Sequence, residues 1–91
     1  MSITSSQNQR YFRTSNFYAA AFLYANDQTL VNIDKEPGRK RALFVFIDSP
    51  EREKLLQVFS FAKDDSPELK VDARKFVTAV KLLKDKLYQE F

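Results

Sequence analysis

The hydrophobic residues of the chain fall into segments of two kinds. Alternating or doubly apolar runs rich in aromatic and β-branched residues predict strands, and runs with a period near 3.6 residues predict helices. Six such segments follow one another in the order β-α-β-β-α-α, over residues 9–13, 17–25, 29–34, 41–48, 51–62 and 73–90. We therefore predict a small α+β domain in which a three-stranded antiparallel sheet packs with helices.

Polar residues that cap helices mark the starts of the three predicted helices. Thr14, Ser15 and Asn16 are candidate N-caps of the first helix, and Ser49 and Asp72 precede the second and third. The side-chain oxygen of such a residue accepts a hydrogen bond from a backbone N–H that the first helical turn leaves unpaired.

The segments between these elements are predicted as turns or as extended chain. Pro37 and Gly38 supply the fixed φ and the positive φ of a type II turn, so the strands on either side should form a hairpin. A minor strand is expected near residues 68–71. Residues 1–8 are predicted to be a disordered polar tail, and residues 9–91 a single α+β domain.

The predicted strand at residues 41–48 is apolar on both faces. Alternation places one apolar set on each face, Leu43, Val45 and Ile47 on one and Ala42, Phe44 and Phe46 on the other. Three partners can cover the second face: helices of the same chain, a second copy of the chain, or stacked bases. For a homodimer, the candidate interface residues are Phe44, Phe46 and Leu82.

Composition excludes much of enzyme chemistry. The 91 residues include neither His nor Cys, which rules out the common zinc sites, a Cys nucleophile, a Ser-His-Asp triad and disulfides. A glycine-rich phosphate loop is ruled out because the chain has one glycine. Glu68 and Lys70, with Asp48 or Asp65, give only a weak match to a metal-dependent nuclease. We predict a non-enzymatic protein with no metal and no cofactor.

The formal net charge of +3 is confined to the first part of the chain. Residues 1–41 contain six basic and three acidic residues, whereas residues 42–91 contain nine of each. Basic residues interleaved with aromatic ones suit nucleic acid, because guanidinium groups hold phosphates while rings stack on bases. The candidate nucleic-acid-binding residues are Arg10, Tyr11, Arg13, Lys35, Arg39, Lys40 and Arg41.

The order and spacing of several segments resemble one small family. They are residues 11–23, then Gly38-Arg39-Lys40 before residues 43–50, then residues 71–76 and 82–84. Together they resemble the family catalogued as domain of unknown function 5659, found in bacteria and their phages. The resemblance implies a compact single domain often carried by mobile genetic elements, and it brings no established activity or site residues.

These observations support three hypotheses for function. The first is a small nucleic-acid-associated binding domain, expected to be a cytoplasmic homodimer. The second is a protein–protein interaction module, such as a phage adaptor or an inhibitor of a host defence complex. The third is an oligomer that sequesters nucleotides. A membrane partner is not expected, because no segment has the roughly 20 apolar residues of a membrane helix and the polar start lacks a signal-peptide core.

Overall fold

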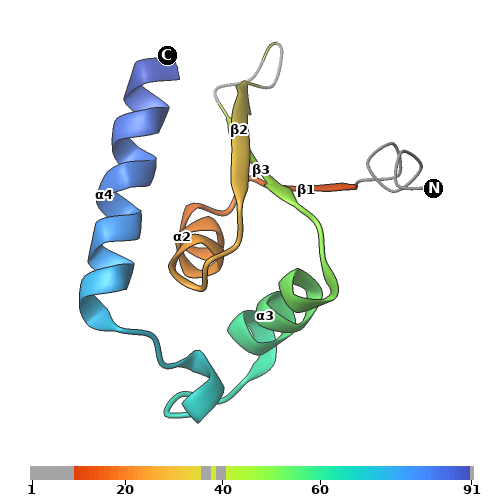
Figure 1. Cartoon of the computed structure of the whole chain (residues 1–91), viewed down its shortest axis with the longest axis vertical. Helices are drawn as coiled ribbons and strands as arrows, with labels where there is room; N and C mark the ends of the chain where they lie inside the picture. Colours follow the sequence, from red (N-terminus) through yellow and green to blue (C-terminus); the bar gives the residue numbers. More distant parts are fainter. Residues whose placement is uncertain (1–9, 36–37, 39–40, 91) are drawn as a thin grey trace, which may run out of the picture.

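A computed structural model describes residues 10–35, 38 and 41–90 of the chain. It confirms the α+β architecture, with a three-stranded sheet and helices gathered on one side of it (Figure 1). The elements, in chain order, are β1 (Tyr11–Thr14), α2 (Phe17–Ala25), β2 (Leu30–Lys35), β3 (Ala42–Ile47), α3 (Pro50–Phe61), the 3-10 helix η1 (Pro67–Leu69) and α4 (Ala73–Glu90).

The sheet has the strand order β1-β3-β2, and both pairs of neighbours are antiparallel. The doubly apolar strand β3 is therefore the central strand, hydrogen-bonded on both edges. In the register, Phe12 lies opposite Phe46 and Ile33 lies opposite Phe44, so these four residues share one face. A bulge in β2 between Leu30 and Asn32 shifts that register locally.

Helix α2 is apolar all round, and the fold buries it on several sides. Six of its nine residues are buried, including three consecutive alanines and Leu23. The helix begins at its cap Asn16, whose side-chain oxygen accepts hydrogen bonds from the N–H groups of Tyr18 and Ala19, both at 3.1 Å. It ends at Asn26 and Asp27, and Asp27 has a left-handed φ of 67°. The predicted extent and cap of this helix are confirmed.

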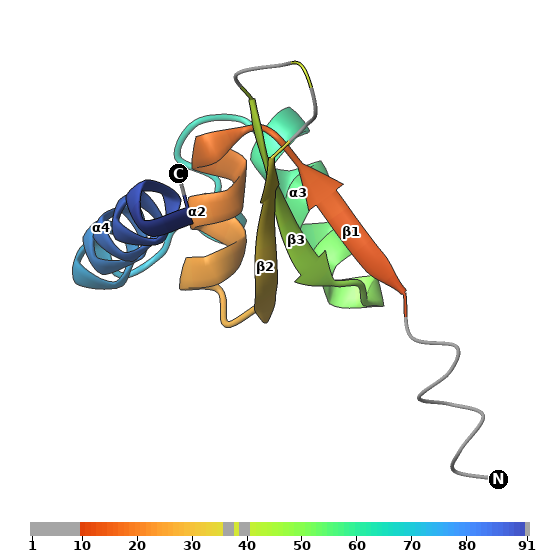
Figure 2. The same ribbon diagram turned by 90° about the horizontal axis from the view of Figure 1, so that it is seen from above.

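Helices α3 and α4 begin at the predicted caps. Ser49 accepts a hydrogen bond from the N–H of Arg52 at 3.1 Å, and Pro50 occupies the first helical turn. Asp72 accepts from the N–H groups of Arg74 and Lys75 at 2.8 and 3.2 Å. Both helices pack against α2, and α4 lies on the far side of α2 from most of the sheet (Figure 2).

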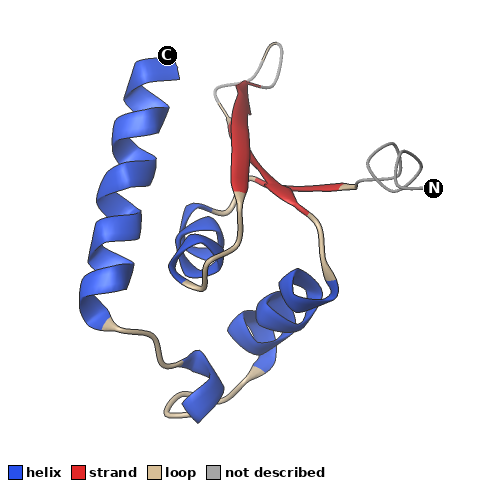
Figure 3. Ribbon diagram, in the orientation of Figure 1, coloured by secondary structure: helices blue, strands red, loops and turns tan. Residues whose placement is uncertain are grey.

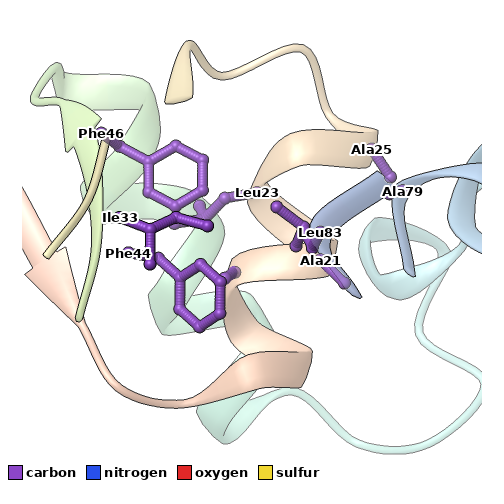
Figure 4. Close-up of a cluster of buried hydrophobic side chains, with 9 residues drawn as sticks. Ala21, Leu23, Ala25, Ile33, Phe44, Phe46, Ala79 and Leu83 are labelled. Atoms are coloured by element: carbon purple, nitrogen blue, oxygen red, sulfur yellow. The ribbon is translucent and has the colours of Figure 1, made fainter. Parts of the chain in front are cut away.

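The core is built in layers around α2. Phe44, Phe46 and Ile33 point from the sheet toward Leu23 (Figure 4). On the other side of α2, small side chains let α4 approach closely, with Ala79 and Leu83 buried against it. Three further apolar residues of α4 pack against this cluster as well: Phe76, Val80 and Leu87.

The predicted minor strand near residues 68–71 is wrong. Residues Pro67–Leu69 form η1, in which the N–H of Leu69 donates to the carbonyl oxygen of Ser66 and that of Lys70 to Pro67 (Figure 3). The physical reason is the proline, whose fixed φ starts a helical turn and whose missing N–H is not needed there. Gly38 has a φ of 73°, as the predicted turn requires, while Pro37 lies outside the described residues.

Two adjacent leucines of α4 provide a test of the layered core. Leu83 is completely buried between α4 and α2, whereas Leu82 is 39% exposed. Leu83→Ala should lower the free energy of unfolding by about 2–5 kcal/mol, because it leaves a cavity, and Leu82→Ala by less than about 1 kcal/mol. Urea denaturation followed by circular dichroism measures both. Equal effects would contradict the packing of α4 on α2.

Candidate functional site

The two faces of the sheet differ completely in their cover. One face packs on α2 and α3, and it includes Phe44 and Phe46, which are 2% and 0% exposed. Their predicted place in an interface is therefore corrected: the helices of the same chain already cover these rings. Leu82, the third residue of that prediction, is exposed on α4.

The opposite face of the sheet, called the open face below, has no helix over it in the described part of the chain (Figures 1 and 2). The strand register places seven residues on it: Tyr11 and Arg13 of β1, Asn32 and Asp34 of β2, and Leu43, Val45 and Ile47 of β3. The open face thus has an apolar central strand flanked by polar and aromatic side chains on both edge strands.

A polar network on the open face surrounds its apolar centre. Arg13 and Asn32 are the register partners of Val45 on its two sides. The side-chain amide of Asn32 donates to Asp34 Oδ1 at 2.7 Å, and Arg13 Nε lies 3.7 Å from Asp34 Oδ2. Val45 is only 4% exposed although no helix covers it. Long polar side chains can cover apolar surface in this way while their charged ends stay in water.

The ion pair between Arg13 and Asp34 is weak enough for another anion to replace Asp34. The side chain of Arg13 is 52% exposed and that of Asp34 is 41% exposed. Exposed pairs at such distances contribute at most about 1 kcal/mol, so a better-placed anion can compete for the guanidinium group. Tyr11, two residues from Arg13 on the same strand face, is 47% exposed.

The structure divides the predicted nucleic-acid-binding residues. Tyr11 and Arg13 lie together on the open face, and alternation from Leu43 puts exposed Arg41 on the same side. Lys35 pairs in register with Ala42, on the helix-covered side, and Arg10 shares that side with Phe12. Arg39 and Lys40 lie outside the described residues. The basic residues therefore do not form one patch in the described structure.

Arg10 contributes to a separate charge cluster where β3 leads into α3. Arg52 Nε donates to Asp48 Oδ1 at 2.7 Å, and its guanidinium carbon lies 4.0 Å from the centre of the Phe12 ring. The hydrogen bond from Arg52 lowers the pKa of Asp48 by more than burial raises it. The N–H of Ser49 and the charge of Arg10 lower this pKa further. The cluster ties α3 to β1 and is structural.

Two surface hollows lie at the end of α2. One, of about 470 Å³, is lined by residues including Tyr24, Asp27, Arg74 and Lys75. Lys75 Nζ lies 3.3 Å from Asp27 Oδ1, so these two charges are paired. The other, of about 360 Å³, lies between the segment that follows α2, helix α3 and η1, and includes Glu51 and Glu68 in its lining. Within the described residues, no group of three or more acidic side chains is placed to hold a metal ion.

Comparison with known proteins gives one match. The model of the family described as Domain of unknown function (DUF5659) matches residues 9–89. The chain belongs to this family. The match covers every helix and strand of the fold apart from the last residue of α4, so the open face described above is a surface of the family's domain in this chain. No curated protein and no solved structure matches the chain significantly.

Among the described residues of this DUF5659 domain, no helix is long and apolar enough to cross a membrane.

The charge cluster at Asp48 leads to a prediction about pH. Because folding lowers the pKa of Asp48, its contribution to stability is present above the unfolded pKa of about 3.9 and is lost as the pH falls through the folded value. Asp48→Asn should therefore reduce the free energy of unfolding at pH 7. The difference from the unmodified chain should become smaller as the pH falls below the unfolded pKa and toward the lowered pKa of folded Asp48. Urea titrations at pH 7 and below the unfolded pKa measure it, and a gap that persists undiminished at low pH would contradict the assignment.

Proposed function

We propose that the open face binds single-stranded nucleic acid without catalysing a reaction. The observation that carries the proposal is a sheet face without a helix over it in the described part of the chain, on which half-exposed Tyr11 and half-exposed Arg13 lie two residues apart on β1. A ring on a sheet offers a base a stacking surface, and an adjacent guanidinium group offers its phosphate a pair of hydrogen-bond donors. In single strands the bases are accessible for such stacking.

The apolar centre of the open face supports the same binding mode. Leu43 and Ile47 lie in the middle strand and are partly exposed, so a base stacked on Tyr11 has apolar surface beside it. Ile47 is the register partner of Tyr11. Exposed Arg41, which alternation places on this side beyond Leu43, adds a positive charge at the other end of the central strand.

The size of the open face favours a nucleic-acid strand over a second copy of the chain. Three strands of four, six and six residues, about 4.8 Å apart, project an area of about 250 Å². Stable protein dimers bury about 800 Å² on each partner. A strand of two or three nucleotides needs no more than the smaller area, because each base stacks separately. A homodimer through this face remains the alternative outcome of the experiments below.

The basic test is a fluorescence anisotropy titration of labelled single- and double-stranded oligonucleotides at low salt. Single strands should bind more tightly, and the affinity should fall as salt is added, because binding releases counterions. Absence of binding at about micromolar protein would refute the proposal, since even non-specific binders register in that range. Light scattering on the same samples reports the mass, and a dimer dissociated by open-face substitutions would favour the alternative.

Substitution of Tyr11 tests the stacking contact. Tyr11→Ala should weaken single-strand binding about tenfold or more, because base–aromatic stacking contributes about 1–3 kcal/mol per base. Tyr11→Phe should retain most of the affinity, because the ring remains. Tyr18→Ala is the matched control, since Tyr18 is 62% exposed but belongs to α2 rather than to the open face. Equal losses from the two alanine variants would contradict a specific role of Tyr11.

Substitution of Asp34 tests the ion pair on the open face. Asp34→Asn should tighten oligonucleotide binding by severalfold, because it removes a carboxylate that repels phosphate and frees Arg13 from its partner. Asp85→Asn makes the same change in net charge on exposed α4 and should have a smaller effect. The difference between the variants should shrink at high salt. An unchanged or weaker affinity for Asp34→Asn would mean that phosphate does not approach this face.

A further inference from the structure

Residues 42–91 have no net charge, but they contain one strongly basic helix. Residues 42–72 contain four basic and seven acidic residues, whereas residues 73–90, the extent of α4, contain five basic and two acidic. The opposite imbalances cancel in the sum. Helix α4 therefore carries a net charge of +3, as large as that of the whole chain.

The charges of α4 follow a regular spacing. One stripe along the helix, called the α4 stripe below, consists of Arg74, Val77, Lys81, Lys84 and Tyr88. The steps between them are three, four, three and four residues, which keeps all five on one face of a helix. All are exposed, Val77 by 52% and Tyr88 by 75%. The residues that pack on α2 form a different face: Phe76, Ala79, Val80, Leu83 and Leu87.

The α4 stripe contains cations without carboxylates. Asp85 borders it one position beyond Lys84, but no acidic residue stands within it. Within the described part of the chain, the side chains of Arg74, Lys81 and Lys84 form no ion pair. Two exposed apolar residues stand among these three cations, which a surface that is merely solvated does not require.

We propose that the α4 stripe docks an acidic amphipathic helix of a partner protein. Alternating steps of three and four are the spacing by which one helix packs along another. Val77 and Tyr88 would contact apolar residues of the partner, and Arg74, Lys81 and Lys84 would pair with its carboxylates. The stripe rises about 21 Å from Arg74 to Tyr88, which three heptads of a partner helix cover completely.

The charge pattern excludes a second copy of α4 as the occupant. A copy laid along the stripe would bring cations next to cations in a contact with no carboxylate to compensate them, which is unfavourable. The phosphates of a nucleic-acid backbone would pair with the cations, but they would make no apolar contact with Val77 and would not require the helical spacing of the stripe. The acidic helix is the occupant that accounts for all five residues. Helix α4 and the strands β1 and β3 lie on opposite sides of α2, and the α4 stripe shares no residue with the open face, so this proposal is independent of nucleic-acid binding (Figure 2).

The experiment uses the full chain and a synthetic acidic peptide. The peptide has three heptads with leucine at one seam position and glutamate at the other, carries a fluorescent label, and is titrated by anisotropy. We expect saturable binding in the micromolar range. Lys81→Glu should weaken it by more than about tenfold, because an attractive contact becomes repulsive. Lys86→Glu is the matched control, since it makes the same charge change on an exposed residue of α4 outside the stripe.

A charge-swapped peptide separates docking from general effects on the fold. The variant with both Lys81→Glu and Lys84→Glu should lose the acidic peptide and bind a version with lysine in place of glutamate. An unfolded variant would not gain a partner. Equal losses from Lys81→Glu and Lys86→Glu, or no binding at about millimolar peptide, would overturn the proposal. A selective loss of oligonucleotide binding in Lys81→Glu would also overturn it, since the stripe would then contact phosphate.

Discussion

The burial of α2 is the constraint on which the rest of the structure depends. A nine-residue helix with no charged side chain is unfavourable when it is fully exposed to water, because most of its area is apolar on every side. The sheet supplies Phe44 and Phe46 on one side, α4 supplies Ala79 and Leu83 on another, and α3 contributes Phe59, whose ring centre lies 5.2 Å from that of Phe22. Both of the longer helices, α3 and α4, therefore pack around α2, and within the described residues no helix covers the other face of the sheet.

The open face is a consequence of this use of the helices. Because β3 is apolar on both faces, its outer side chains must be covered by the edge strands alone. Arg13 and Asn32 flank Val45 and join through Asp34. These side chains shield Val45 from solvent, while Tyr11 and the ends of the polar side chains stay in contact with solvent. A face covered only by an exchangeable ion pair is suited to binding, since a ligand can replace the pair at low cost.

Local signals in the sequence were sufficient for most of the fold. The helix boundaries were predicted because Asn16, Ser49 and Asp72 act through neighbouring backbone groups, and the strands because apolar residues cluster there. The cover of β3 was beyond such signals, since Phe44 and Val45 look equally apolar in sequence and only tertiary packing distinguishes their faces. The place of Lys35 relative to Arg13 likewise depends on strand register, which alternation within one strand does not determine. Charge summed over half the chain concealed the basic α4.

The layered arrangement also bears on how the two proposed surfaces act together. The open face belongs to the sheet and the α4 stripe to α4, and both the sheet and α4 pack around the core centred on α2. Since the two surfaces share no residue, the two proposals do not require their ligands to compete. Coupling between binding sites requires an element with two arrangements that both ligands bias, and a core closed around alanines offers little room for a second one. Under the two proposals, the domain would bind its two partners independently and bring a nucleic-acid strand and a protein together through proximity.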